Sequence, residues 1–266
     1  MSTATWRWLD ERVPAQIVYS DLDGTMVGPR GCFVRQAGGA TTLEPAQALV
    51  DLLDAGIPLV LVSGRSRLQL LESAGIYGAD GFIAEIGGVV AWRAEDARFT
   101  WQALPASGPP ASHALLAAML EAFPGLAVYE PYNEGHEVDV LLRGHADAAA
   151  VEAWLSERGA PHLRLRDNGL LPRDMGHAWH LVPDGVSKGA AVAWDIARRG
   201  LTAADAIAIG DSIEDLGMAP HVSRFFLCRN ATAHPSFDAD ALAANVTITE
   251  RPLGLGWVEA VRTALG

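Results

Sequence analysis

Short apolar segments that end abruptly in polar, glycine-containing loops constrain the fold of this chain most strongly. Residues 15–20 (AQIVYS) run directly into the loop DLDGT, and IPLVLV at 57–62 runs into SGR. Between them, LEPAQALVDLLDAG places leucines and alanines on one helical face, with a proline near its start and a glycine past its end. GFIA at 81–84 is a third such segment. This β-α-β alternation predicts an α/β fold with a parallel sheet and right-handed crossovers.

The pattern changes in the middle of the chain. Residues from about 89 to 182 contain alanine-rich helices and the candidate strands VVAWRA, LAVYE, VDVLLR and AWHLVP, which predicts an inserted α+β domain. The α/β pattern resumes with the helix SKGAAVAWDIARRG, for which Ser187 is the expected N-cap, and with the strands AIAIG, RFFLC and VTITE. We therefore expect a core domain at 1–88 and 183–266 and an inserted domain at 89–182.

Charge and composition exclude several classes of protein. The 266-residue chain has a formal net charge of −12, which argues against binding to nucleic acid or anionic lipid. Its two cysteines, Cys32 and Cys228, suggest neither a disulfide framework nor a zinc site. The N-terminus lacks the apolar core of a signal peptide, and no apolar run reaches membrane-spanning length. We expect a cytoplasmic protein with a small-molecule partner; the sequence does not predict its oligomeric state.

Three polar clusters follow strands, at the edge where a doubly wound sheet binds its ligands. In DLDGT, Asp21 and Asp23 point to the same side of an extended segment, and Gly24 lets the backbone turn. One carboxylate can attack phosphorus, and the second can protonate the leaving oxygen and then activate water. The alternative is an ordinary turn at the end of a strand.

The phosphate-binding candidates are Ser63 and Lys188. The Ser63 hydroxyl and the amides of the Gly64 turn form a possible anion nest, although a Ser-Gly turn before a helix is often only a cap. Lys188 lies in the first turn of its helix, where the macrodipole opposes a cation unless an anion lies nearby. The alternative is a solvated surface lysine.

GDSIED supplies the candidate metal ligands Asp211 and Asp215. Asp211 follows a strand directly, and Asp215 lies four residues later, so both carboxylates can face one site. Mg²⁺ prefers such oxygen ligands, completed by water and phosphate. Ser212 and Asp215 also fit a capping box, and both interpretations can hold together.

Taken in order, DLDGT, SGR, Lys188 and GDSIEDLGM resemble the four motifs of the haloacid dehalogenase-like phosphatase superfamily. The resemblance implies a Rossmann-like core with a cap, Asp21 as nucleophile, Asp23 as general acid/base, and Ser63 and Lys188 as phosphoryl ligands. It also implies Mg²⁺ held by Asp21, the Asp23 backbone carbonyl and Asp211, with Asp215 assisting. The remaining motif residues assigned to phosphate or substrate binding are Gly24, Thr25, Gly64 and Arg65.

The position of the insertion resembles the sugar-phosphate (Cof-type) branch with a large α/β cap, and within it the mannosyl-3-phosphoglycerate phosphatases. Two departures bear on the substrate. Glu214 precedes Asp215 where the branch often has Asn, and Glu85-Ile86-Gly87-Gly88 replaces an ENGG loop. The Asn contact that relatives could make from that loop is therefore missing.

The insertion must supply contacts to the leaving group if it closes over the site. Its basic candidates are Arg164, Arg166, Arg173, His177 and His180, for each of which a surface role is the main alternative. An arginine would hold the carboxylate of a phosphoglycerate bidentately. A sugar would need hydroxyl contacts and an aromatic platform, for which Trp92, Trp101, Trp154 and Trp179 are candidates, with a core role expected for each.

The motifs predict a Mg²⁺-dependent phosphatase that acts through an aspartyl-phosphate, and the resemblance implies as substrate a phosphorylated sugar or phosphoglycosyl acid, such as mannosyl- or glucosyl-3-phosphoglycerate. Two alternatives remain open. A sugar phosphomutase of the same branch would return the phosphoryl group to sugar, and a catalytically silent regulator would only bind a sugar phosphate.

Overall fold

A computed structural model describes residues 15–104, 108–235 and 237–266, and it confirms the α/β class. The larger sheet has eight strands in the order β12-β11-β10-β1-β2-β3-β4-β5. All neighbours from β12 to β3 pair in parallel, whereas β4 and β5 are antiparallel. The strands are β1 (Ile17–Asp21), β2 (Leu59–Val62), β3 (Gly81–Ala84), β4 (Val89–Arg93), β5 (Phe99–Ala103), β10 (Ala206–Gly210), β11 (Arg224–Leu227) and β12 (Val246–Ile248).

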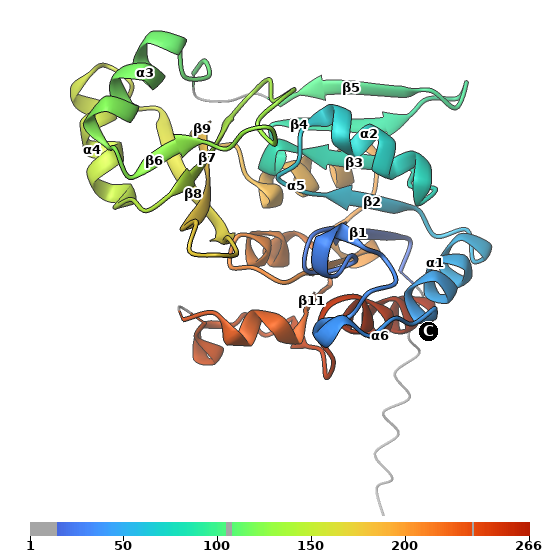
Figure 1. Ribbon diagram of the computed structural model, residues 1–266. Helices are drawn as coiled ribbons and strands as arrows, with labels where there is room; N and C mark the ends of the chain where they lie inside the picture. The colour runs from blue at the N-terminus through green and yellow to red at the C-terminus, as the bar shows by residue number, and fades with distance from the viewer. Residues whose placement is uncertain (1–14, 105–107, 236) are drawn as a thin grey trace, which may run out of the picture.

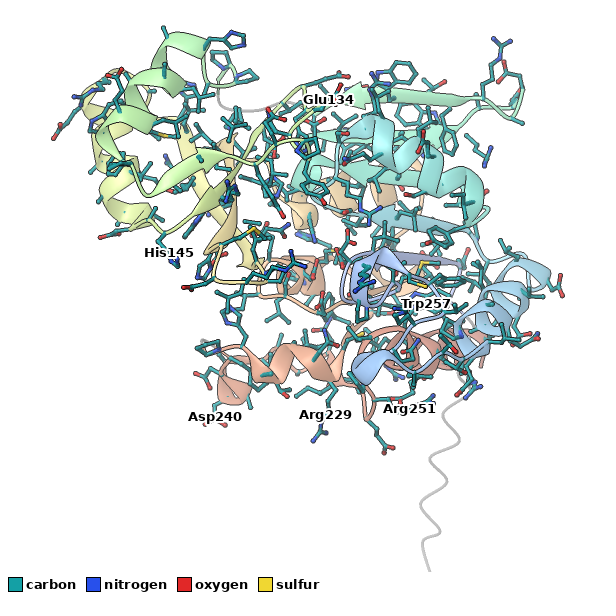
Figure 2. The ribbon with its side chains drawn as sticks, viewed as in Figure 1. Glu134, His145, Arg229, Asp240, Arg251 and Trp257 are labelled. Carbon is teal, nitrogen blue, oxygen red and sulfur yellow. The ribbon has the colours of Figure 1, made fainter. Side chains whose placement is uncertain are left out.

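Helices cover both faces of this sheet because its buried strands are apolar on both sides. The helical elements are α1 (Glu44–Asp54), α2 (Arg67–Ile76), α5 (Lys188–Arg198), α6 (Leu253–Leu265) and the 3-10 segment η5 (Asp215–His221). Val18 and Leu59 pack on one face of the sheet against α1, α2 and α6. Trp257 of α6 is fully buried in this layer (Figure 2). Tyr19 and Val60, the next residue along each strand, pack on the other face with α5 and η5.

Strand β1 lies at the switch point of the parallel region. The chain proceeds from β1 to β2 and β3 on one side, and returns through β10, β11 and β12 on the other. In such sheets the crevice at the carboxyl ends of the strands, next to the switch point, is where ligands bind. Asp21, the last residue of β1, therefore lies at the position that the fold favours for a ligand.

A second, smaller unit lies at one end of the molecule, at the upper left of Figure 1. Its antiparallel sheet has the order β6-β7-β9-β8 and packs against two helices. Its elements are α3 (His113–Ala122), β6 (Leu126–Val128), β7 (Val140–Gly144), α4 (Ala148–Glu157), β8 (Leu163–Leu170) and β9 (His177–Pro183). Leu142, Val151 and Leu181 belong to a buried cluster of its own, so this unit has a separate hydrophobic core.

The expected start of the insertion at residue 89 needs correction. VVAWRA was expected in the inserted domain, but β4 pairs with β3 in the larger sheet, with Ile83 opposite Val90, and β5 follows as the edge strand. A tight turn at Gly87 and Gly88 lets the chain fold back as a hairpin on the open edge of β3. We propose a domain boundary between Ala103 and His113, with the inserted unit ending near Pro183.

No helix in the described ranges is both long and apolar enough to cross a lipid bilayer. Most of the N-terminal segment that argued against a signal peptide, residues 1–14, lies outside the described residues.

Candidate active site

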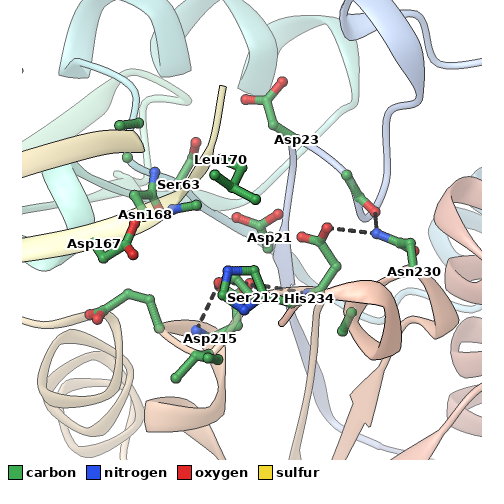
Figure 3. A pocket seen from close by; sticks show the side chains of 18 of the residues that line it. Asp21, Asp23, Ser63, Asp167, Asn168, Leu170, Ser212, Asp215, Asn230 and His234 are labelled. Carbon is green, nitrogen blue, oxygen red and sulfur yellow. Dashed lines mark hydrogen bonds between the residues drawn. The ribbon is translucent and has the colours of Figure 1, made fainter. Parts of the chain in front are cut away.

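The carboxyl ends of the strands meet at one cavity of about 920 Å³ (Figure 3). Asp21 ends β1, Ser63 follows β2 and Asp211 follows β10, while Lys188 begins α5 on the facing side. All four residues line this cavity, together with residues of β8 and β9 from the smaller unit. The structure therefore brings together the three polar clusters that the sequence separates by up to 190 positions (211 − 21).

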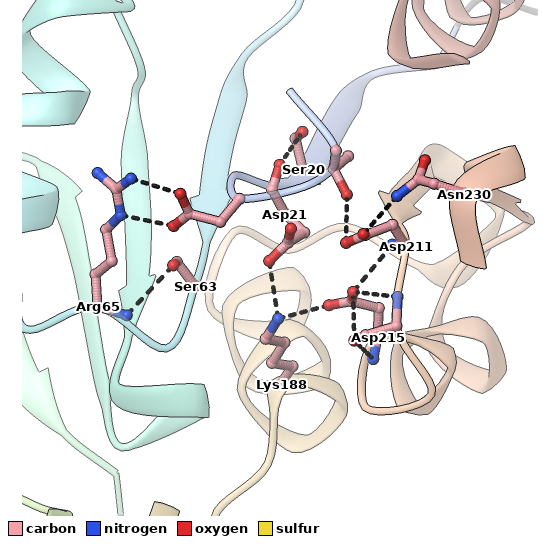
Figure 4. Close-up of polar contacts among 11 residues, drawn as sticks. Ser20, Asp21, Ser63, Arg65, Lys188, Asp211, Asp215 and Asn230 are labelled. Atoms are coloured by element: carbon pink, nitrogen blue, oxygen red, sulfur yellow. Dashed lines mark hydrogen bonds and ion pairs between the residues drawn. The ribbon is translucent and has the colours of Figure 1, made fainter. Parts of the chain in front are cut away.

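Lys188 is the only lysine in a chain that contains 20 lysine and arginine residues, and it is buried rather than solvated. Its Nζ donates to Asp21 Oδ1 at 2.8 Å and to Asp215 Oδ1 at 2.6 Å (Figure 4). Burial alone would lower the pKa of Lys188, but the charges of Asp21 and Asp215 outweigh burial and raise it. The alternative of a surface lysine is therefore wrong, because the expected anions lie opposite it.

Asp215 holds the loop after β10 in place. Its Oδ2 accepts hydrogen bonds from the Asp211 amide at 3.0 Å and from the amide and hydroxyl of Ser212 at 3.0 and 2.7 Å. The Asp215 amide in turn donates to Ser212 Oγ at 3.2 Å, which completes the reciprocal cap that the sequence suggested. The capping role is therefore confirmed, while the other oxygen pairs with Lys188 and the metal role of Asp215 stays a prediction.

Asp211 is oriented by two neighbours. Its Oδ1 accepts from Thr25 Oγ1 at 3.2 Å, and its Oδ2 accepts from Asn230 Nδ2 at 2.7 Å. Asn230 also donates to the Gly24 carbonyl at 3.0 Å. Gly24 has φ +88°, and a Cβ at this position would lie 2.3 Å from Asp211 Oδ2. The turn therefore requires glycine both for its backbone conformation and for the close approach of Asp211.

Asn230 was missed by the sequence analysis. It lies just after β11, so the rule that selected Asp21 and Asp211, a polar residue beyond the carboxyl end of a parallel strand, also applies to it. Its position three residues beyond the strand end, within RNATAH rather than in a recognisable motif, hid that signal.

The carboxylates at the cavity floor are short of positive charge. Asp21, Asp211 and Asp215 each offer an oxygen within 4.8 Å of the others, and Lys188 is the cation paired with them. Burial and the charge of Asp215 raise the pKa of Asp21 to about 7, and burial and Asp21 raise the pKa of Asp211. Asp21 Oδ2 is buried without a hydrogen-bond partner. These oxygens suit a divalent cation, which would neutralise them and use the free oxygen.

Asp23 and Arg65 form a bidentate ion pair at the rim of the cavity. Arg65 Nε and Nη2 donate to the two carboxylate oxygens of Asp23 at 2.7 and 2.6 Å (Figure 4). The side chain of Asp23 is 52% exposed, whereas Asp21 is buried. The Arg65 amide also donates to Ser63 Oγ at 3.3 Å. Arg65 thus links the second motif to the first.

The cap candidates divide between the cavity and the surface. Arg166 and His180 line the cavity, whereas Arg164, Arg173 and His177 are not among its lining residues. Arg164 instead donates to Asp184 at 3.0 Å, and His177 pairs with Asp167 at 2.8 Å.

Glu214 lies at the cavity, whereas the candidate tryptophans for a sugar platform lie away from it. Glu214 lines the cavity, and its burial raises its pKa. None of the four tryptophans considered as a sugar platform belongs to the lining: Trp92, Trp101, Trp154 and Trp179. Trp92 packs against Trp194, Trp154 packs against Phe123, and Trp179 lies in the core of the smaller unit, so these three have the core role that we expected. For Trp101 that expectation is wrong, because its ring is exposed at the surface with Arg67 stacked over it.

Comparison with known proteins identifies relatives along nearly the whole chain. The phosphoglycolate phosphatase of Methanoculleus marisnigri is 29% identical over 246 residues, covering 91% of this chain and 94% of that protein. The phosphoglycolate phosphatase of Pyrobaculum aerophilum is 28% identical over 253 residues, covering 94% and 96%.

Solved structures share the fold. The sucrose-phosphatase from Synechocystis sp., in complex with sucrose and phosphate, has a TM-score of 0.69 at 18% identity, covering 95% of this chain and 98% of that chain. A haloacid dehalogenase-like hydrolase from Bacteroides thetaiotaomicron has a TM-score of 0.66 at 17% identity, covering 93% and 98%.

A family model described as sucrose-6F-phosphate phosphohydrolase matches residues 14–261. The match spans both motif-bearing ends of the chain and the insertion between them. The chain therefore belongs to the sucrose-6F-phosphate phosphohydrolase family of haloacid dehalogenase-like phosphatases.

Proposed function

We propose that this phosphatase is Mg²⁺-dependent and hydrolyses a phosphorylated sugar or phosphoglycosyl acid through an aspartyl-phosphate on Asp21. The observation that carries the proposal is the state of Asp21, whose Oδ1 is held by Lys188 while its Oδ2 is buried, unpartnered and on the cavity wall. The names of the relatives, which include sucrose-phosphatase and phosphoglycolate phosphatase, support a small phosphate monoester as the substrate class.

In the first step, a carboxylate oxygen of Asp21 attacks phosphorus, and the bond from phosphorus to the leaving oxygen breaks. Asp23 donates the proton that this oxygen takes up. To do so its carboxyl group leaves the Arg65 ion pair at the partly exposed rim and first takes up a proton from solvent. In the second step, water attacks the phosphorus of the aspartyl-phosphate, Asp23 takes the proton, and the bond to Asp21 breaks to release phosphate.

Positioning and charge stabilise these steps. Lys188, Ser63 and the amides around Gly64 and Thr25 are proposed to bind the phosphoryl oxygens. The side chains of Asp21 and Asp211 and the backbone carbonyl of Asp23 are proposed to hold Mg²⁺, with Asp215 assisting. The bound Mg²⁺ would neutralise phosphoryl charge and orient the phosphate for in-line attack.

Metal dependence is tested by phosphate release from a panel of phosphorylated sugars, glycosyl-3-phosphoglycerates, phosphoglycolate and p-nitrophenyl phosphate. We expect chelation to abolish release and Mg²⁺ to restore it. Asn230→Ala removes a hydrogen bond that orients Asp211, so it should raise the Mg²⁺ concentration for half-maximal activity roughly 10–100-fold. Full activity after chelation, with metal analysis showing none bound, would contradict the proposed cofactor.

Asp23→Asn should affect the two steps differently according to the leaving group. For a sugar phosphate we expect a fall in kcat of about 10²–10⁴-fold, because the leaving alkoxide needs the proton. p-Nitrophenolate leaves without one, so rapid mixing should show a burst of p-nitrophenol near one equivalent, followed by slow turnover. Asp51→Asn on the exposed side of α1 is the matched control. If the rate of the burst with p-nitrophenyl phosphate fell as much as the rate of the later turnover, the acid/base role of Asp23 would be contradicted.

The same panel separates the alternatives. Turnover of a sugar phosphate to an isomer, without release of inorganic phosphate, would identify the phosphomutase. The silent regulator receives no support from the comparisons, since the family model and the curated relatives are named as phosphatases. The cytoplasmic location remains a prediction.

A further inference from the structure

His180 of β9 is a fully buried histidine that reaches the catalytic cavity from the smaller unit. Its Nδ1 is hydrogen-bonded to Asp139 Oδ2, while its Nε2 is buried without a hydrogen-bond partner. A buried polar atom of this kind is destabilising unless a ligand or a water molecule completes its bonding.

Asp139 determines which ring nitrogen of His180 carries the proton. Its second oxygen pairs with His136 Nδ1 at 2.5 Å, so one carboxylate binds two imidazole rings. Burial alone would raise the pKa of Asp139, but His180 and His136 outweigh burial and hold it well below its ordinary value. An ionised Asp139 accepts one hydrogen bond from the Nδ1–H of each imidazole. In the neutral tautomer of His180 that carries its proton on Nδ1, Nε2 is a hydrogen-bond acceptor.

This arrangement is fixed to the core domain. Glu85, in the loop after β3, accepts from the amides of Glu137 and Val138 at 2.9 and 2.7 Å through its Oε2. These two residues lie between His136 and Asp139 in the sequence. The core loop therefore holds the His136–Asp139 segment in place, and with it the orientation of His180.

Nε2 of His180 lies directly over the phosphate-binding turn. A Cβ added to Gly64 would lie 2.7 Å from His180 Nε2 and 2.8 Å from Asn168 Nδ2. The imidazole of His180 and the amide of Asn168 thus lie close together above Gly64, next to Ser63. His180 and Asn168 both line the cavity. A hydroxyl group, which donates one hydrogen bond and accepts another, matches this pair.

We propose that His180 is a specificity-determining residue that accepts a hydrogen bond from a hydroxyl of the leaving group, with Asp139 and His136 as positioning residues. The proposal rests on the proposed phosphatase function and names the substrate class of that site. It favours sugar and polyol phosphates over phosphoglycolate, whose leaving group carries a carboxylate and no further hydroxyl.

The test compares kcat/KM for two substrate sets, with glucose 6-phosphate and sucrose 6-phosphate on one side and phosphoglycolate and p-nitrophenyl phosphate on the other. His180→Asn keeps an amide that can donate to Asp139 but has no atom at the Nε2 position. We expect the ratio of the first set to the second to fall about tenfold, chiefly through KM. Asp139→Asn should lower the same ratio, because its amide donates to Nδ1 and leaves the proton on Nε2.

His177→Asn is the matched control. His177 lies on the same strand and pairs with Asp167 through Nδ1, but it is not part of the cavity lining. The ratio should not change in this variant. An equal loss for both substrate sets in His180→Asn, with KM unchanged, would assign His180 a structural role and overturn the proposal.

Two other results would also overturn it, for different reasons. His136, Asp139 and His180 are a possible ligand set for a transition metal, so one equivalent of bound zinc that His136→Asn or His180→Asn loses would make the cluster a metal site. Absence of phosphate release from every compound by the folded wild-type enzyme with Mg²⁺ would instead remove the proposed function itself. Metal analysis and the wild-type assay distinguish these outcomes.

Discussion

Asp21→Asn is expected to lower kcat by at least about 10⁴-fold while leaving the protein as stable as the wild type or slightly more stable. An amide does not attack phosphorus, so the aspartyl-phosphate cannot form. The amide oxygen can still accept from Lys188, and the variant removes a buried negative charge whose pKa burial and Asp215 raise to about 7. Phosphate release and thermal unfolding, measured on the same preparation with Mg²⁺ present, check both parts.

Asp51→Asn makes the same chemical change on the exposed side of α1, and it should alter neither the rate of phosphate release nor the temperature of unfolding. If Asp21→Asn kept more than about a tenth of the wild-type rate, the covalent mechanism would be excluded, since loss of a true nucleophile removes nearly all turnover.

Lys188→Met is expected to lower both activity and stability. Removal of the Nζ leaves the buried carboxylates of Asp21 and Asp215 without their cation, which costs about 3–5 kcal/mol of unfolding free energy. We also expect kcat to fall about 10³-fold, because the phosphoryl group loses a charged ligand. Denaturant titration and steady-state kinetics measure the two effects.

A double variant separates these effects. Adding Asp21→Asn to Lys188→Met removes one unpaired carboxylate, so part of the lost stability should return while activity stays absent. A Lys188→Met enzyme of wild-type stability would show that the ion pairs contribute nothing net to the fold. Because Lys188 is the only lysine in the chain, amine-selective labelling reports its exposure directly: we expect little modification of its Nζ in the folded protein and ready modification after unfolding.

The parallel half of the fold and the convergence of the motifs were predictable from the sequence. Asp21, Ser63 and Asp211 each follow a short apolar strand, and the carboxyl ends of parallel strands lie at one edge of the sheet whatever the details of packing. Lys188 was placed correctly because helix geometry put it in a first turn. Its burial became clear only from the two carboxylates that face it.

The parts that were missed depend on pairing between distant segments. Periodicity identified β4 as a strand but did not show that it pairs with β3, because an antiparallel hairpin can join whichever sheet edge is open. The alternative of a surface role is correct for Arg164, which pairs with Asp184, but wrong for His180, which is buried at the cavity. His180 lies only three residues along the same strand from His177, which is outside the cavity lining. Residues three apart on a strand point to opposite faces, and which face of β9 turns toward the cavity depends on how the smaller sheet packs, which the local sequence does not determine.

The measurement that tests the central claim most directly is chemical trapping of the phosphorylated enzyme. Asp23→Asn enzyme, in which the second step should be slow, is mixed with Mg²⁺ and p-nitrophenyl phosphate and quenched with borohydride, which reduces an acyl phosphate to an alcohol. Peptide mass spectrometry is then expected to find homoserine in place of Asp21. Nitrophenol release with Asp21 unmodified, or with the label on another residue, would contradict the assignment of Asp21 as the nucleophile.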